Sequence, residues 1–156
     1  MSTQEQIAQA LHIEINNNED PKSRLIICVK KKIGNVDLDN GHFGLICAHS
    51  TGIAFNAWDG NQQNNNWFTN YPNITFNDTF KQEDFNNWRY NSFRKLVLEM
   101  NSDLEFERTK SKLIRDEIPF RICGEIAFGD AEVAIVIFPL TQEQTPKYLK
   151  FLKVWR

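Results

Sequence analysis

The residues of this chain best suited to catalysis are two histidines and two cysteines. His42, Cys47 and His49 lie close together in the sequence, and Cys123 lies far from them. A thiol nucleophile needs a base within hydrogen-bond reach and a third group that orients the base. Cys47 and His49 are two residues apart. On a strand their side chains would share a face but stand too far apart for a tight ion pair.

Two hypotheses fit these residues. The first is that the three cysteines, which include Cys28, are small buried hydrophobic groups, because each lies inside an apolar run. The second is that Cys47 or Cys123 is the nucleophile of a small hydrolase, with His42 or His49 as its base. No hydrolase signature surrounds any of them, so we favour the buried thiols and keep the hydrolase as the alternative.

Metal and phosphate sites have little support in the sequence. The stretch from His42 to His49 offers two imidazoles and a thiol, but structural zinc sites usually take paired ligands from tight turns. Asp37 and Asp39 fit the start of a calcium loop, yet its twelfth position is Ala48 instead of the required Glu. The glycine patterns of nucleotide phosphate sites are absent. The sequence therefore predicts no metal and no cofactor.

A dense basic cluster is formed by Lys30, Lys31 and Lys32, with Lys22 and Arg24 nearby. Single-stranded nucleic acid is bound by basic residues interleaved with aromatic ones, and few aromatic residues neighbour this cluster. The net charge of −2 gives no general excess of cations for phosphates. A nucleic-acid-binding module that uses Lys30–Lys32 is a further alternative, but we expect solvated lysines at a strand end.

The most unusual stretch is residues 59–91, which we call the aromatic-amide segment. It contains ten asparagines and eight aromatic residues. Asn supplies a hydrogen-bond donor and an acceptor on a short side chain. Tyr and Trp supply large contact areas with few torsions to immobilise, and they are enriched at the energetic centres of protein interfaces. The composition favours a binding surface over a reaction centre.

We therefore expect a protein that binds another protein and acts by occlusion. A candidate of this kind is an immunity or antitoxin-type inhibitor of a toxin or enzyme domain. Acidic residues that flank the rings would speed the encounter with a basic partner. The predicted partner-binding residues are Asp59, Trp67, Phe68, Tyr71, Asp78, Glu83 and Asp84.

Length and composition predict a single globular domain over residues 1–156. The N-terminal residues lack a basic stretch followed by an apolar one, and no apolar run is long enough to cross a bilayer. The odd number of widely spaced cysteines gives no disulfide framework. We expect a cytoplasmic protein that does not associate with membranes.

The chain predicts an α+β fold, with helices packed on a mostly antiparallel sheet of about five or six strands. We expect an internal strand near 24–31, a hairpin from 43–49 and 53–58, and a hairpin from 120–128 and 132–138. Helices are expected near residues 2–11, 85–100 and 104–117, and from Thr145-Pro146 onward. Asn101-Ser102-Asp103 should end one helix and cap the next.

Overall fold

A computed structural model describes residues 23–63 and 82–156, with the backbone alone described for residues 59–63 and 82. The helix expected near residues 2–11 lies outside this part of the chain. The elements are β1 (Arg24–Lys30), β2 (Lys32–Ile33), β3 (Val36–Asp37), α2 (Asn40–Gln63), α3 (Gln82–Asn87), the π-helix η1 (Trp88–Ser92), β4 (Arg94–Met100), α4 (Asp103–Arg115), β5 (Phe120–Glu125), the 3₁₀ turn η2 (Ile126–Phe128), β6 (Ala131–Leu140) and α5 (Lys147–Lys150).

The main sheet has four strands in the order β4-β1-β6-β5. Strand β1 is parallel to β4 and antiparallel to β6, and β5 is antiparallel to β6. Strands β2 and β3 form a separate two-stranded sheet whose turn contains Gly34 at φ 63°. The α+β class is confirmed. Within the described residues the main sheet is mixed and has four strands, where a mostly antiparallel sheet of five or six is predicted.

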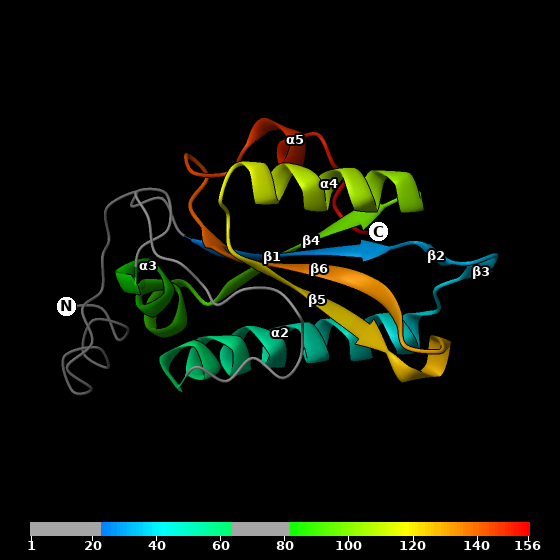
Figure 1. Cartoon of the computed structure of the whole chain (residues 1–156), viewed down its shortest axis with the longest axis horizontal. Helices are drawn as coiled ribbons and strands as arrows, with labels where there is room; N and C mark the ends of the chain where they lie inside the picture. Colours follow the sequence, from blue (N-terminus) through cyan, green and yellow to red (C-terminus); the bar gives the residue numbers. More distant parts are fainter. Residues whose placement is uncertain (1–22, 64–81) are drawn as a thin grey trace, which may run out of the picture.

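The sheet lies between two layers of helices (Figure 1). Helix α2 covers one face, and α4 and α5 cover the other. One core cluster lies on the α2 side around Leu25 and Ile27, and the second lies on the opposite side around Ile26 and Cys28. Strand β1 is therefore buried on both faces, as its apolar run predicts. The predicted β5–β6 hairpin is present with β6 internal to the sheet, but its first strand ends at Glu125, and Ile126–Phe128 form the 3₁₀ turn η2 where a strand is predicted.

The hairpin predicted from residues 43–49 and 53–58 is wrong, because these residues belong to helix α2. Asp39 begins the helix by accepting a hydrogen bond from the His42 backbone N–H at 2.8 Å. The buried side chains of α2 recur every three or four residues and include Ile46, Ile53 and Ala57. The alternating pattern of Phe43 to His49 fits a strand equally well in the sequence, but half-exposed Leu45 shows that it does not describe the buried face.

The five-turn helix predicted over residues 85–100 is also wrong. The helical stripe holds through Phe85 and Trp88, both fully buried, and ends at Phe93 in a left-handed backbone conformation. The following residues form β4, which pairs in parallel with β1. Leu96 and Met100 fit a helical spacing, but with Leu98 they also fit the period of a strand, and pairing with β1 favours the strand.

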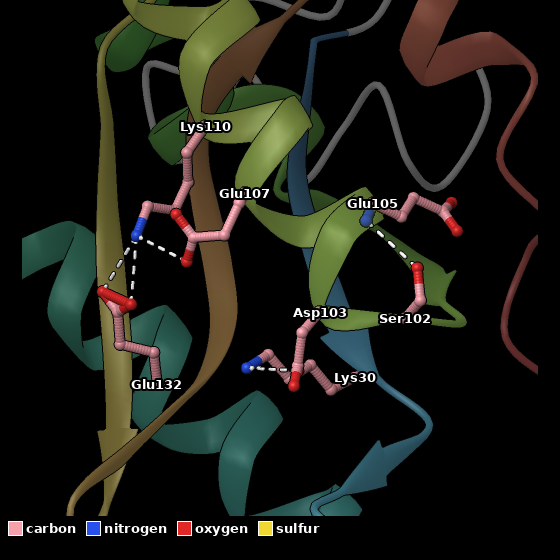
Figure 2. A network of polar contacts seen from close by, with 7 residues as sticks. All are labelled: Lys30, Ser102, Asp103, Glu105, Glu107, Lys110 and Glu132. Atoms are coloured by element: carbon pink, nitrogen blue, oxygen red, sulfur yellow. Dashed lines mark hydrogen bonds and ion pairs between the residues drawn. The ribbon is translucent and has the colours of Figure 1, made fainter.

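Helix α4 is confirmed, and Ser102 is its N-cap, accepting a hydrogen bond from the Glu105 N–H at 3.1 Å. Figure 2 shows how ion pairs fasten α4 to the sheet. The Lys110 Nζ lies 3.0 Å from the carboxylate of Glu132 on β6, and the Lys30 Nζ lies 3.0 Å from Asp103. These contacts fix the α4 side of the sheet.

After α5, the chain returns to the outer edge of β4. The β4 residue Glu99 donates its N–H to the Lys153 carbonyl at 2.8 Å, and the Trp155 N–H bonds to the Val97 carbonyl at 2.9 Å. The Trp155 ring stacks on Phe43 of α2 with 4.2 Å between the centroids. This segment covers the β4 edge by a short antiparallel pairing.

Candidate functional site

Cys47 and His49, the closest thiol and imidazole in the sequence, point to different sides of α2. Two residues along an α-helix are separated by about 200° around its axis. The Cys47 side chain is half-buried, whereas that of His49 is exposed. The structure therefore separates the pair that a strand would have placed on one face.

The thiols carry no sign of activation. Burial raises the pKa of Cys28 to about 12 and that of Cys123 to about 11. Burial also raises the pKa of Cys47 above its ordinary value. A catalytic cysteine needs the opposite shift, because the thiolate is the nucleophile. The hypothesis of buried thiols is confirmed for Cys28 and Cys123, and Cys47 is partly accessible.

Both histidines contact carboxylates. The Nδ1 atom of His42 lies 2.7 Å from Asp39 Oδ2, and this histidine's backbone and side-chain hydrogen bonds lower the pKa of Asp39. The Nδ1 atom of His49 lies 3.4 Å from Oε2 of the buried Glu125, an ion-pair distance without hydrogen-bond geometry. Within the described residues, no hydrogen bond joins either imidazole to a thiol.

The lysines of the 30–32 cluster each have an acidic partner. The Lys30 side chain is only 14% exposed, and its Nζ contacts Asp103 (Figure 2). The same Nζ lies 4.4 Å from the Phe106 ring centroid. Lys31 approaches Glu99 at 3.5 Å, and Lys32 approaches Asp37 at 3.7 Å. A phosphate backbone would have to displace these carboxylates from the lysines. The ion pairs therefore argue against a nucleic-acid site at this cluster.

Most of the predicted partner-binding residues lie outside the described part of the chain, namely Trp67, Phe68, Tyr71 and Asp78. Asp59 lies on α2, but its side chain is not among those described. Glu83 and Asp84 occupy the first turn of α3, where Glu83 is exposed and Asp84 is half-buried. Of the predicted set, the structure therefore places only these two neighbouring carboxylates.

The end of the aromatic-amide segment is anchored in the core by two rings. Phe85 stacks on Trp58 with 4.2 Å between the centroids, and it also contacts Phe138 of β6. The indole N–H of Trp88 donates to the Arg94 carbonyl at 2.7 Å. Both anchor rings are fully buried. The segment from α3 to β4 is thereby held against the sheet.

Beside these anchors, the chain presents a group of exposed side chains that we call the η1 surface. Tyr90 is 67% exposed and Phe93 is 44% exposed, in contrast to the rings that precede them. Two exposed amides belong to the same stretch: Asn91 directly follows Tyr90, and Asn87 lies three residues before it. The η1 surface consists of Asn87, Tyr90, Asn91 and Phe93.

The backbone below this surface is unusual in two ways. Residues Trp88–Ser92 form a π-helix, a rare conformation that is frequent at functional sites. Phe93 then adopts φ 48°, a left-handed conformation that costs energy for a residue with a side chain. The anchoring of Trp88 compensates for this strain, and the turn projects Tyr90 and Phe93 outward. The residue spacing does not predict this turn, because Phe93 fits the stripe of a regular helix.

Cations contact the rings of the η1 surface and its neighbours. The Lys95 Nζ lies 3.1 Å from the Phe93 ring centroid, and burial lowers the pKa of Lys95. The Arg89 guanidinium lies 5.1 Å from the Phe55 centroid and 5.4 Å from that of Tyr90. Arg and Tyr together are typical of interface centres, so this arrangement suits docking.

Among the residues that the structure describes, no group of three or more His, Cys, Asp or Glu side chains could hold a metal ion. No helix within the same residues has the length and apolar character needed to cross a membrane. The chain matches no protein-family model, and the comparison with curated proteins finds no relative.

Proposed function

We propose that this protein is a binding module that docks onto another protein through the η1 surface and acts by occlusion. An inhibitor of a toxin or enzyme domain, of the immunity or antitoxin kind, is the function that suits it best. The observation that carries the proposal is the exposure of Tyr90 and Phe93 directly beside the buried anchors Phe85 and Trp88.

The physical basis is preorganisation. Binding costs conformational entropy when contact residues must be ordered, and this cost is small for rings on an already fixed backbone. Phe85 and Trp88 fix the backbone of the η1 surface, since both are buried in the aromatic cluster under α2. Tyr90 and Phe93 then offer a large apolar area with few torsions to immobilise.

The chemistry of the remaining residues favours binding over turnover. Raised thiol pKa values leave Cys28 and Cys123 protonated near neutral pH. The imidazoles of His42 and His49 contact carboxylates and not thiols. These features argue against the small Cys/His hydrolase, the alternative function.

The proposal includes a single domain that works in the cytoplasm. The three cysteines are free thiols in the structure, as suits a reducing compartment. Helices on both faces enclose two core clusters around one sheet, which suits a single folding unit. The two remaining carboxylates of the predicted site, Glu83 and Asp84, would belong to the rim of the docking surface.

Affinity purification from the protein's own host tests the proposal. Wild type is compared with Y90A/F93N, which removes both exposed rings, and with L104S/I114S, which removes two apolar side chains of α4 that are each 59% exposed. We expect one stoichiometric protein partner with wild type and with L104S/I114S, and its loss with Y90A/F93N. Recovery of no such partner, or equal loss with both double variants, would contradict the proposal.

A further inference from the structure

Four cations lie on or beside the η1 surface in the part of the chain that the structure describes. Arg24, Arg89, Arg94 and Lys95 lie on or beside it, and none of them forms an ion pair within residues 23–63 and 82–156. The lysines of the 30–32 cluster, by contrast, all have carboxylate partners. The chain has a net charge of −2, so a group of cations that have no ion-pair partner among the described residues is unusual for it.

The sheet brings two of these cations together. Arg24 and Arg94 are register partners at the start of the parallel strands β1 and β4. Like charges on neighbouring strands repel, so this pairing costs stability unless an anion lies between or above them. The Nε atom of Arg24 is buried and has no hydrogen-bond partner.

The other two cations lie on the rings. Lys95 follows Arg94, so its side chain leaves the strand on the opposite face and reaches Phe93 and Trp88. Arg89 contacts Phe55 and Tyr90. Cations therefore flank the exposed rings as well as the adjacent strand ends.

Between residues 82 and 95 two carboxylates accompany three cations, Arg89, Arg94 and Lys95. The carboxylates are Glu83 and Asp84, both in the first turn of α3, where the helix dipole already favours negative charge. The sequence-based expectation was that acidic residues would attract a basic partner. The described charges around the η1 surface instead favour a partner with a negatively charged face.

We propose that the face of the partner that docks on the η1 surface is acidic. Its carboxylates pair with Lys95 and Arg89 beside the Tyr90 and Phe93 rings, and with Arg94 at the adjacent strand end. This inference rests on the proposed function, because it names the chemistry of the partner at the same surface. Arginine binds carboxylates bidentately, which gives the contact a defined orientation.

A protein carboxylate fits this surface better than single-stranded nucleic acid. Nucleic-acid sites of that kind need free ring faces on which bases stack. The Lys95 Nζ lies over the Phe93 ring at 3.1 Å and Arg89 lies over the Tyr90 ring, so a cation occupies one face of each ring. The net charge of −2 also opposes a long run of phosphates.

The test uses poly-L-glutamate as the acidic probe and oligo-dT as the competing polyanion, with binding followed by fluorescence anisotropy across a salt series. R94E/K95E reverses Lys95, which lies on the Phe93 ring, and Arg94, which lies at the adjacent strand end. R108E/K150E makes the same charge change at two exposed residues, one on α4 and one on α5. We expect poly-L-glutamate to bind the wild-type protein. Its affinity should be about tenfold lower for R94E/K95E and nearly the same for R108E/K150E.

Equal weakening by both variants, no binding of poly-L-glutamate, or tighter binding of oligo-dT would overturn the inference. The same variants are then tested against the partner recovered by affinity purification. If Y90A/F93N does not bind the partner but R94E/K95E binds it normally, the result would support the docking function and contradict the inference that the partner's face is acidic. Failure to recover any partner would count against the docking function itself.

Discussion

Phe93 is the residue at which the chain leaves the π-helix and enters strand β4. Its backbone has φ 48°, its N–H bonds to the Trp88 carbonyl at 2.7 Å, and its ring is partly exposed. Trp88, five residues earlier, is completely buried. Neighbouring aromatic residues of one segment thus serve as an anchor and as an exposed contact.

The strain at Phe93 predicts a difference between two variants that both remove the ring. Asn tolerates the left-handed conformation, whereas β-branched Val does not. We expect F93V to have a free energy of unfolding about 1 kcal/mol or more below that of F93N. Urea unfolding of the two proteins measures this difference. Equal stabilities would mean that the left-handed conformation at Phe93 is not retained in solution.

The cysteines predict a graded reaction with iodoacetamide near neutral pH. Cys28 and Cys123 should stay unmodified in the folded protein because they are buried and their pKa values are raised to about 12 and about 11. Cys47 should react slowly, because it is partly accessible but burial raises its pKa. Peptide mass mapping identifies the modified residue, with urea-unfolded protein as the control. Rapid modification of any one cysteine would support the alternative hypothesis of a small Cys/His hydrolase.

At the scale of elements, α4 is the helix whose beginning the sequence predicts best. Ser102 should contribute about 1 kcal/mol to stability through its bond to the Glu105 N–H. We expect S102A to lose that amount in a urea titration and S102D to retain most of it, because Asp is also a favourable N-cap. An S102D protein as unstable as S102A would contradict the capping role.

The sequence correctly predicts the elements whose residue pattern fits only a helix or only a strand. The continuous apolar run of β6 and the capped, charged helix α4 are such cases. It fails for α2 and β4, where apolar spacing fits both a helix and a strand, as Phe43 and Cys47 illustrate in α2. Contacts across the sheet decide between the two, and a single sequence does not contain them.

The candidate site could be predicted only in part for the same reason. The aromatic-amide composition predicts a binding segment, and of the carboxylates predicted for it the structure describes the side chains of Glu83, which is exposed, and Asp84, which is half-buried. The exposure of Tyr90 and Phe93 depends on a π-helix and on the parallel pairing of β4 with β1. Neither feature has a signal in the spacing of the residues.

The whole molecule should lose stability as the pH rises above about 9. An unfolded thiol ionises near its ordinary pKa of 9.0, whereas folded Cys28 and Cys123 keep their protons to about 12 and about 11. Unfolding between these values therefore releases protons, and stability falls with pH. Burial, together with the hydrogen bond from Tyr148 to Asp116, raises the pKa of Tyr148 and acts in the same direction.

We expect each buried thiol to contribute a loss of about 1 kcal/mol in the free energy of unfolding near pH 10, relative to neutral pH. Urea titrations with a reductant present measure the change, and C28A should show a smaller pH dependence than wild type. A free energy of unfolding that is constant or increases over this range would contradict the burial of the thiols.

The central claim is that the molecule docks through one place on its surface, the turn from α3 to β4. Hydrogen exchange of the protein alone and in complex with its recovered partner tests this most directly. We predict slower exchange for the amides of residues 88–95 in the complex, and unchanged exchange in α4. Protection confined to α4 or β5, with residues 88–95 unaffected, would contradict the claim.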